Sequence, residues 1–223
     1  LEEKGVNFWK GNTSREFLDN RGLHHLEEGD MGKAYGYQWR NSGGVDQLEY
    51  LLHELEHNPC SRRLLVDLWN PSELDEMALT PCWWSCQFSV IRSSEGFSTL
   101  HMVVNNRSLD LLVGMPYAVT QYRMFQMVLA DIFGFKLGQA VFNTTNIHIY
   151  ETQYEYVDKL LKSSEGEDYL YNSLGSIVYT GSKLGRTPLD ALLNVKWEDF
   201  EVKLDIEPKT NEQIGCSMPR MVA

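Results

Sequence analysis

The apolar stretch from Val119 to Phe133 limits what this chain can fold into more than any other feature. It carries Tyr122, Phe125 and Leu129, and Gly134 follows its last apolar residue. A helix with apolar side chains around most of its circumference is stable only when other elements cover it on most sides. We therefore predict that this helix is buried on most sides.

The rest of the chain alternates between helical and strand-like periodicity and contains no internal repeat. The predicted helices are a short one that starts at the capping box Thr13–Glu16 and closes near Gly22, then residues 45–57 and residues 152–162. The predicted strands are residues 64–69, 99–104, 141–150 and 197–206. Residues 87–90 form the start of another strand, and residues 27–40 are predicted as a loop followed by a strand. Such alternation predicts a single α/β or α+β domain over residues 1–223, with a polar, glycine-rich surface insertion at 163–193.

Charge and composition disfavour several classes of function. The chain has 223 residues, enough for a sizeable core, and its formal net charge is −11. A surplus of acidic groups argues against non-specific binding to nucleic acid or to anionic lipid. No apolar run approaches the ~18 residues that a membrane span needs. With four cysteines and no visible signal peptide, we expect a reducing, cytoplasmic location.

The stretch HELEH matches the HExxH pattern of zinc proteases. In a helix, His53 and His57 would share one face, with Glu54 as general base and Glu73 as a candidate third ligand. The alternative is the solvated face of an amphipathic helix that buries its leucines. The helix stop at Pro59 favours this alternative, because it leaves no further turn to supply a ligand.

A cysteine stands where a loop meets a predicted strand. Cys82 follows Pro81 in the stretch LTPCWWSCQFSV. A thiol is a nucleophile only as its thiolate, which needs a cation or a base nearby. The alternative is a small, buried apolar residue. Cys82 and Cys86 lack a second pair of metal ligands, so we predict no metal site.

Arginines flank two predicted strands and suit a phosphate group. Guanidinium groups bind a phosphate dianion bidentately, and a hydroxyl adds a further donor, although each arginine alone is an ordinary surface charge. The candidates are Arg62, Arg63, Arg107 and Ser108. His148 and Tyr150 lie on one face of another predicted strand. Together with a thiol, these groups suggest a small phosphorylated substrate.

Several stretches, taken in order, resemble the thymidylate synthase family, which includes nucleotide hydroxymethylases. They are GVNFWKGNTSREFLDNRG, EEGDMGKAYGYQWR, GVDQL, NPCSRR, WNPSELDEMALTPC, CQFSV, RSLDLLVGMPY and HIY. The resemblance covers Gly5 to about Lys162 and again Trp197 to Val202. It implies an α/β (α+β) fold with a large twisted mixed sheet, flanking helices, and a homodimer whose two sheets pack back to back.

By this resemblance, Cys82 is the nucleophile that attacks ring carbon 6 of a 2′-deoxypyrimidine monophosphate, dUMP or dCMP. The adduct makes ring carbon 5 nucleophilic, and that carbon takes a one-carbon unit from the co-substrate 5,10-methylenetetrahydrofolate. Tyr35 then belongs to a proton-transfer network, and Trp9 shields the intermediate. The implied phosphate ligands are Arg107 and Ser108, with Arg62 and Arg63 supplied by the other subunit. The implied sugar ligands are His148 and Tyr150, and the implied folate side comprises Trp9, Asn12, Asp110 and Gly114.

The chain departs from the family pattern around the base. Synthases carry an asparagine, and deoxycytidylate hydroxymethylases an aspartate, where this chain has Ala118. Trp83 replaces the histidine after the nucleophile, and Asn106 replaces a glutamine. The side chain of Ala118 forms no hydrogen bond. We therefore predict weak discrimination between uracil and cytosine, unless Asn106, Gln121 or an ordered water contacts the base.

Three functions follow as hypotheses. VVNNRS is closer to the hydroxymethylase pattern, so the first is a pyrimidine deoxynucleotide hydroxymethylase, in which water adds to the intermediate. Trp9 favours the alternative, a thymidylate synthase, in which hydride from the folate reduces the intermediate. The third is a catalytically silent relative that serves as a binding or dimer partner. The family's upstream segment, which holds a phosphate-loop arginine and the general-base glutamate, is absent from these 223 residues, and Glu2 and Glu3 lie too close to Trp9 to replace that glutamate. Two alternatives stay open: this chain begins late, or the protein lacks these groups.

Overall fold

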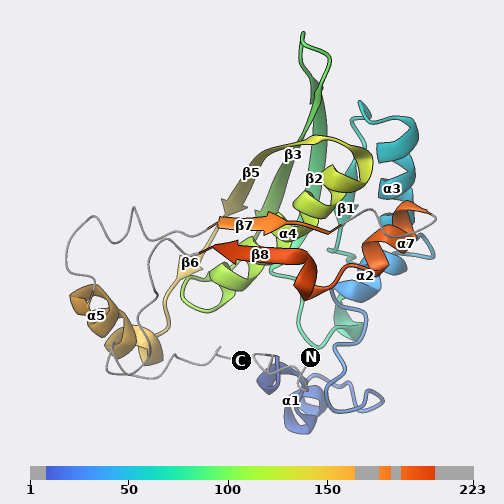
Figure 1. Ribbon diagram of the computed structural model, residues 1–223. Helices are drawn as coiled ribbons and strands as arrows, with labels where there is room; N and C mark the ends of the chain where they lie inside the picture. The colour runs from blue at the N-terminus through green and yellow to red at the C-terminus, as the bar shows by residue number, and fades with distance from the viewer. Residues whose placement is uncertain (1–8, 164–175, 182–186, 204–223) are drawn as a thin grey trace.

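A mixed four-stranded sheet forms the centre of the computed structural model, which describes residues 9–163, 176–181 and 187–203 (Figure 1). Its strand order is β1-β2-β3-β5, from β1 (Leu65–Asp67), β2 (Trp83–Arg92), β3 (Ser98–Asn106) and β5 (Lys136–Thr144). β2 runs antiparallel to both of its neighbours, β1 and β3, and β5 runs parallel to β3. The hairpin of β2 and β3 projects beyond the other elements (Figure 1). The predicted α/β class and mixed sheet are confirmed.

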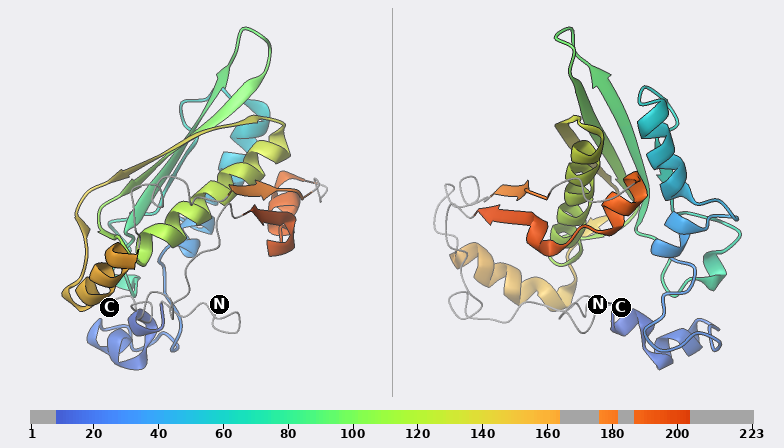
Figure 2. Two further views of the ribbon diagram at one scale, coloured as in Figure 1. Left: turned by 60° about the vertical axis from the view of Figure 1, so that its left-hand side comes forward. Right: turned by 45° about the vertical axis from the view of Figure 1, so that its right-hand side comes forward.

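The predicted buried helix is α4 (Gly114–Phe133), which begins at Gly114 rather than Val119. It lies against β3 and β5 on one side. On its other side it contacts β7 (Ser176–Tyr179), which pairs with β8 (Phe200–Lys203), as Figure 2 shows. Gly134 ends the helix with φ of 67°, a left-handed conformation that favours glycine. Burial of α4 on most sides is confirmed.

Helix α3 (Gln47–His57) packs beside β1 and contacts the short helix α7 (Pro188–Leu193). Its N-cap residue is Asp46, whose side-chain carboxylate accepts a hydrogen bond from the Glu49 backbone N–H. Four leucines at helical spacing on one side of α3 are buried: Leu48, Leu51, Leu52 and Leu55. They share one core with the inner face of the sheet, which contributes Phe88, Leu100, Met102 and Val104.

The opposite, outer face of the sheet carries a row of side chains in register: Leu65, Gln87, Val103 and Val141. Leu65 and Val141 keep 44% and 45% of their surface exposed. In the neighbouring row, Asn105 Nδ2 donates to Ser85 Oγ at 2.9 Å, and Asn143 Nδ2 donates to Asn105 Oδ1 at 3.1 Å. This outer face is therefore partly apolar and internally hydrogen-bonded.

The smaller elements connect these layers. They are η2 (Gly11–Thr13), α1 (Arg15–Asn20), α2 (Gly36–Arg40), η3 (Leu74–Glu76), β4 (Leu109–Asp110), β6 (Ile147–His148), η4 (Glu151–Gln153), α5 (Tyr154–Ser163) and η5 (Trp197–Asp199). The predicted helices near 15–22 and 152–162 are confirmed as α1 and as η4 with α5. Among the described residues, no helix has the length and apolar character needed to cross a bilayer.

Three predicted strands are wrong in part. Residues 36–40 form α2 instead of a strand, because the backbone turns at Tyr35, with a positive φ of 39°, and a helical turn starts there. Residues 141–150 are divided between β5 and β6, because Asn146 takes a positive φ of 45°. The last strand begins at Phe200, after a 3-10 turn, and residues beyond 203 lie outside the described part. The predicted insertion at 163–193 falls partly outside it too; its described parts include β7 and α7.

Candidate active site

A cavity of about 510 Å³ opens at the end of the sheet where β2 begins and β3 ends. Its volume lies in the range of sites that bind small organic ligands. The predicted site residues that line it are Trp9, Asn12, Tyr35, Cys82, Arg107, Ser108, Asp110, Gly114, Ala118, Gln121, His148 and Tyr150. The fold thus gathers these residues from distant parts of the chain. Three predicted residues, Arg62, Arg63 and Asn106, do not line it.

Cys82 is half-buried and directly precedes β2, which confirms the predicted place where a loop meets the sheet. Arg107 Nη2 lies 4.0 Å from its sulfur. The same guanidinium donates to the carbonyl oxygens of Pro81 at 2.9 Å and of Thr80 at 3.0 Å. Arg107 therefore holds the loop that carries the thiol and places a positive charge beside it, which is what a thiolate nucleophile requires.

Cys86 is the buried cysteine of this strand. It is 1% exposed, and burial raises the pKa of its thiol, so that it stays protonated and unreactive at neutral pH. Cys86 therefore behaves as a small, buried apolar residue. Cys82, for which the same interpretation was considered, instead lines the cavity.

Tyr35 contacts the backbone of Cys82. Its hydroxyl accepts a hydrogen bond from the Cys82 N–H at 3.0 Å, and its ring lies 5.5 Å from that of Trp9. Burial, and next the charge of Cys82, raise the pKa of Tyr35, so the phenol keeps its proton at neutral pH. Its φ of 39° is unusual for an aromatic residue, and such strain concentrates at functional sites.

A polar network holds the strained turn at Tyr35 from both sides. Lys33 Nζ pairs with Glu73 at 3.0 Å, and Gln38 Nε2 donates to Glu73 at 2.8 Å and to the Lys33 carbonyl at 2.9 Å. The hydrogen bond from Gln38, with Lys33 next, lowers the pKa of Glu73 and keeps it ionised. Glu73, considered above as a zinc ligand, therefore holds the side chains of Lys33 and Gln38, which lie on either side of Tyr35 in the chain.

The far wall of the cavity is formed where β4 pairs in parallel with β6. This pairing sets Asp110 opposite His148. His148 Nδ1 donates to the Asn146 carbonyl at 2.9 Å, which leaves Nε2 as the ring nitrogen for a ligand. Tyr150 lies just after the strand, yet its ring meets His148 edge to face at 4.9 Å. Burial, then Asp110 and Cys82, raise the pKa of Tyr150, so its hydroxyl is a donor at neutral pH.

One face of α4 lines the cavity with Gly114, Ala118 and Gln121, which are four and three residues apart. Ala118 is 7% exposed and presents a methyl group where a hydrogen-bonding side chain was expected for the family. Gln121, one turn further along, supplies an amide at the same wall. Residue 118 therefore contributes no polar side chain to this wall of the cavity.

Asn106 lies at the end of β3, 2% exposed, and does not reach the lining of the cavity. Its Oδ1 accepts the Ser108 N–H at 2.8 Å. Because the oxygen must face this donor, Nδ2 is fixed on the other side, where it has no hydrogen-bond partner among the described residues. A buried amide without a partner is rare in folded proteins.

Arg62 and Arg63 lie on the exposed loop before β1, outside the cavity of their own chain. The prediction that they serve the site of another subunit stays a prediction. Apolar and aromatic residues that the sequence did not assign complete the lining: Met31, Ala34, Gly36, Trp39, Leu79, Trp83, Leu109, Tyr117 and Tyr122. Trp83 also packs on Tyr122, with ring centres 5.9 Å apart.

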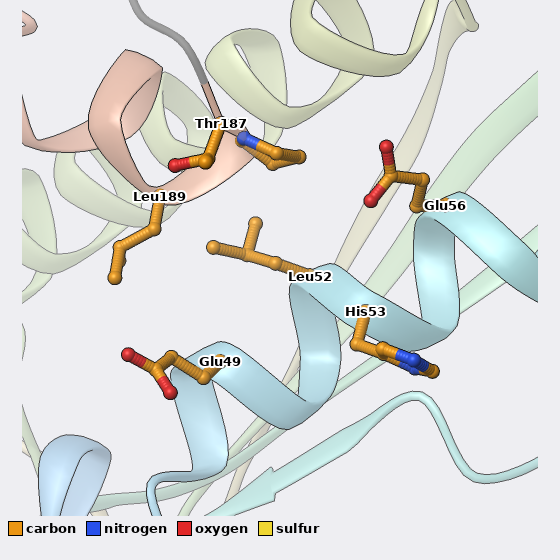
Figure 3. A pocket seen from close by; sticks show the side chains of 7 residues that line it. Glu49, Leu52, His53, Glu56, Thr187 and Leu189 are labelled. Carbon is orange, nitrogen blue, oxygen red and sulfur yellow. The ribbon is translucent and has the colours of Figure 1, made fainter.

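The HELEH stretch lies at the end of α3, next to a second pocket of about 260 Å³ between α3 and α7. Figure 3 shows Leu52 pointing across this pocket toward Thr187 and Leu189, with His53 turned away. His53 and His57 stack ring on ring at 4.3 Å, and His57 Nδ1 lies 3.0 Å from the His53 carbonyl. Among the described residues, no group of three or more His, Cys, Asp or Glu side chains could hold a metal ion.

Comparisons with known proteins agree with the fold and with the cavity. A sequence model of the thymidylate synthase family matches residues 1–203. The thymidylate synthase of Bacillus licheniformis is 41% identical over 165 residues, which are 69% of this chain and 56% of that protein. The thymidylate synthase of Agaricus bisporus is 34% identical over 176 residues, which are 73% of this chain and 60% of that protein. The thymidylate synthase of Saccharomyces cerevisiae is 33% identical over 177 residues.

The chain spans 56% to 60% of the length of these three relatives. The family match, by contrast, runs through almost every described residue, from the N-terminal segment to β8. It includes the loop of Cys82, the strand end at Arg107 and the face of α4 that lines the cavity. The chain therefore belongs to the thymidylate synthase family.

Proposed function

We propose that this protein transfers a one-carbon unit from 5,10-methylenetetrahydrofolate to ring carbon 5 of dUMP, as a thymidylate synthase. The observation that carries the proposal is the Cys82 sulfur, 4.0 Å from Arg107 in a cavity of the right size for a nucleotide and part of a folate. The three relatives described above are all named thymidylate synthase, which supports methylation over our first sequence hypothesis, the hydroxymethylase.

In this proposal, the chain's own residues bind the nucleotide and activate its base. Cys82 adds to ring carbon 6, which breaks conjugation and makes ring carbon 5 a nucleophile toward the one-carbon unit. Arg107 and Ser108 bind the phosphate, and His148 with Tyr150 binds the sugar hydroxyl. Arg107 Nη1 has no hydrogen bond among the described residues, which supports a role for this nitrogen toward phosphate.

The folate side is the wall that holds Trp9, Asn12, Asp110 and Gly114. Asp110 is a buried carboxylate, 8% exposed, whose Oδ1 accepts hydrogen bonds from the Leu112 and Val113 N–H groups just before α4. Trp9 lies against Tyr35 and lines the same cavity as Cys82, and we assign it the role of covering the intermediate that forms on Cys82. Bound there, the folate supplies the one-carbon unit and, in a synthase, the hydride that reduces it.

Hydroxymethylation is the second candidate, and the observation that favours it is the stretch VVNNRS at the end of β3, which is closer to the hydroxymethylase pattern. Product analysis separates the candidates. The full-length protein is incubated with methylenetetrahydrofolate and, in turn, dUMP, dCMP, UMP or CMP, and the products are identified by mass spectrometry. We expect dTMP from dUMP. A hydroxymethylated nucleotide would establish the second candidate, and binding without any product would establish the silent relative.

Residue 118 is expected to control the choice of base. An asparagine there offers an amide to the keto edge of uracil, so Ala118→Asn should raise the preference for dUMP over dCMP by about tenfold; Ala118→Asp should shift it toward dCMP by a similar factor. The measurement is the ratio of kcat/KM for the two nucleotides. Ala118→Leu, which adds similar bulk without a hydrogen bond, is the matched control and should lower both values together. A ratio that none of the three variants changes would mean that another group recognises the base.

We also propose a homodimer with shared active sites. Arg62 and Arg63 are exposed and remote from the cavity of their own chain, and the outer face of the sheet, with Leu65 and Val141 exposed, is suited to pack on a second copy. Mixing a Cys82→Ser chain with a chain that carries Arg62→Ala and Arg63→Ala should restore about a quarter of the wild-type activity, because half the dimers are hybrids with one complete site. Each variant mixed with itself is the control. Active protein that stays monomeric in sedimentation at the assay concentration would exclude this arrangement.

A further inference from the structure

Gln153 is a buried side chain between two walls of the cavity, and the sequence did not single it out. It is 0% exposed. Its Nε2 donates to Asp110 Oδ2 at 3.0 Å, and its Oε1 accepts the backbone N–H of Tyr150 at 3.0 Å. The Gln153 backbone N–H also donates to the Tyr150 carbonyl at 2.8 Å. One amide thus contacts a residue of the folate side and a residue of the sugar side.

The position of Gln153 follows from how two strands leave the small sheet. β4 and β6 run parallel, and each leads into a helix: β4 leads into α4, and β6 leads through η4 into α5. Figure 1 labels β6 and α5. Asp110 Oδ1 accepts the N–H groups of Leu112 and Val113 at 3.0 and 3.1 Å, which fixes the turn into α4. Gln153 occupies the other oxygen. Its side chain therefore joins the two turns beyond the point where the strands end.

The chemistry of the neighbours fixes the orientation of this amide. The Asp110 carboxylate only accepts hydrogen bonds, and the Tyr150 backbone N–H only donates one. Rotating the amide by half a turn would place its NH2 group against the Tyr150 N–H, donor against donor, and its oxygen against the Asp110 carboxylate, acceptor against acceptor. A side chain at position 153 must therefore supply one donor and one acceptor with these directions. Glutamine does so, whereas glutamate keeps only the acceptor.

We propose that Gln153 is a positioning residue that holds Asp110 for the folate and Tyr150 for the nucleotide sugar at the same time. The inference rests on the proposed function and adds a residue that touches neither ligand. It predicts that the two contacts of Gln153 can be separated by substitution. Loss of the donor should affect the folate side alone, and loss of both groups should affect both sides.

Two variants test this separation. Gln153→Glu keeps an acceptor for the Tyr150 N–H and loses the donor to Asp110, so dUMP affinity should stay within about threefold and KM for the folate should rise at least about tenfold. Gln153→Leu removes both groups, so both quantities should worsen by about tenfold or more. A residue that only fills space would weaken both sides equally in the two variants. That result would overturn the proposal.

Hydrogen exchange supplies a measurement that needs no ligand. In the wild-type protein the Tyr150 amide should be protected from exchange. Gln153→Glu should keep that protection, whereas in Gln153→Leu the Tyr150 amide should exchange about tenfold faster or more. Equal protection in all three proteins would refute the positioning role whatever the activity. If the expected exchange pattern appears while neither dUMP nor folate binds, the proposed function fails and the structural role of Gln153 stands.

If Gln153→Leu does not fold, the pair Gln153→Glu with Asp110→Asn replaces it. In this pair the asparagine amide at position 110 donates to the new carboxylate at position 153, which still accepts the Tyr150 N–H. All hydrogen bonds are therefore restored, and the negative charge has moved from position 110 to position 153. The melting temperature should return toward the wild-type value and dUMP affinity should be kept. Folate affinity should remain low, because the carboxylate no longer stands at position 110. Recovery of folate affinity in this pair would contradict the proposal.

Discussion

Replacing Cys82 by serine is expected to reduce kcat by at least about a thousandfold, because an alcohol at neutral pH is a far weaker nucleophile than a thiolate. The fold should be kept, since Cys82 is only half-buried where it packs against the core at a cavity wall, and serine is close to cysteine in size. The measurements are kcat, the melting temperature and the affinity for dUMP. The last two should stay close to the wild-type values.

Cys60→Ser is the matched control for this change. Cys60 is an exposed free cysteine outside the cavity, and its replacement should leave kcat unchanged. Cys86 is less suitable as a control, because it is buried in the core and a hydroxyl there would cost stability. A Cys82→Ser protein that keeps a tenth or more of its wild-type turnover would show that the thiol is not the nucleophile.

Arg107→Ala is expected to have the second largest effect, a loss of about a hundredfold or more in kcat/KM. The change removes the hydrogen bonds to the Thr80 and Pro81 carbonyls that hold the loop, and it removes the cation 4.0 Å from the Cys82 sulfur. Both losses act on the thiol before any substrate binds. The rate at which iodoacetamide alkylates Cys82, followed by mass spectrometry, should therefore fall as well.

Arg107→Lys separates the two effects of this residue. A lysine keeps a positive charge but has no planar group to bond both carbonyls at once, so its activity and alkylation rate should fall between those of the wild type and of Arg107→Ala. The melting temperatures of the two variants show how far the loop has loosened. Alkylation of Cys82 at the wild-type rate in Arg107→Ala would mean that the guanidinium does not activate the thiol.

Much of the fold could be predicted because the long elements have strong periodicity. The leucines of α3 recur at helical spacing and are buried together, and α4 is apolar around most of its surface because a sheet and a ribbon lie on its two sides. The failures have tertiary causes. Residues 36–40 form a helix because the backbone turn at Tyr35 is held by Glu73, which is far away in the sequence. No local pattern encodes such a contact.

The candidate site divides in the same way. Cys82, Arg107 and His148 stand in ordered motifs that resemble a family, and the cavity brings them together as predicted. What the sequence could not show is the geometry between motifs. Asn106 points its oxygen at the Ser108 N–H and stays out of the cavity, and Gln153 joins two walls through contacts with residues on both sides. The contact from Gln153 to Asp110 depends on the pairing of β4 with β6, which only the folded chain establishes.

The most direct test of the proposed chemistry is to trap the covalent adduct. A 5-fluoro-2′-deoxyuridine monophosphate lacks the proton at ring carbon 5 that must leave, so an enzyme of this kind should stop as a complex of protein, nucleotide and folate. The wild-type protein is incubated with this nucleotide and methylenetetrahydrofolate, digested and analysed by mass spectrometry. We predict an adduct on the peptide that contains Cys82, and none in Cys82→Ser. An active enzyme that forms no adduct, or an adduct on Cys86, would contradict the assignment of Cys82 as the nucleophile.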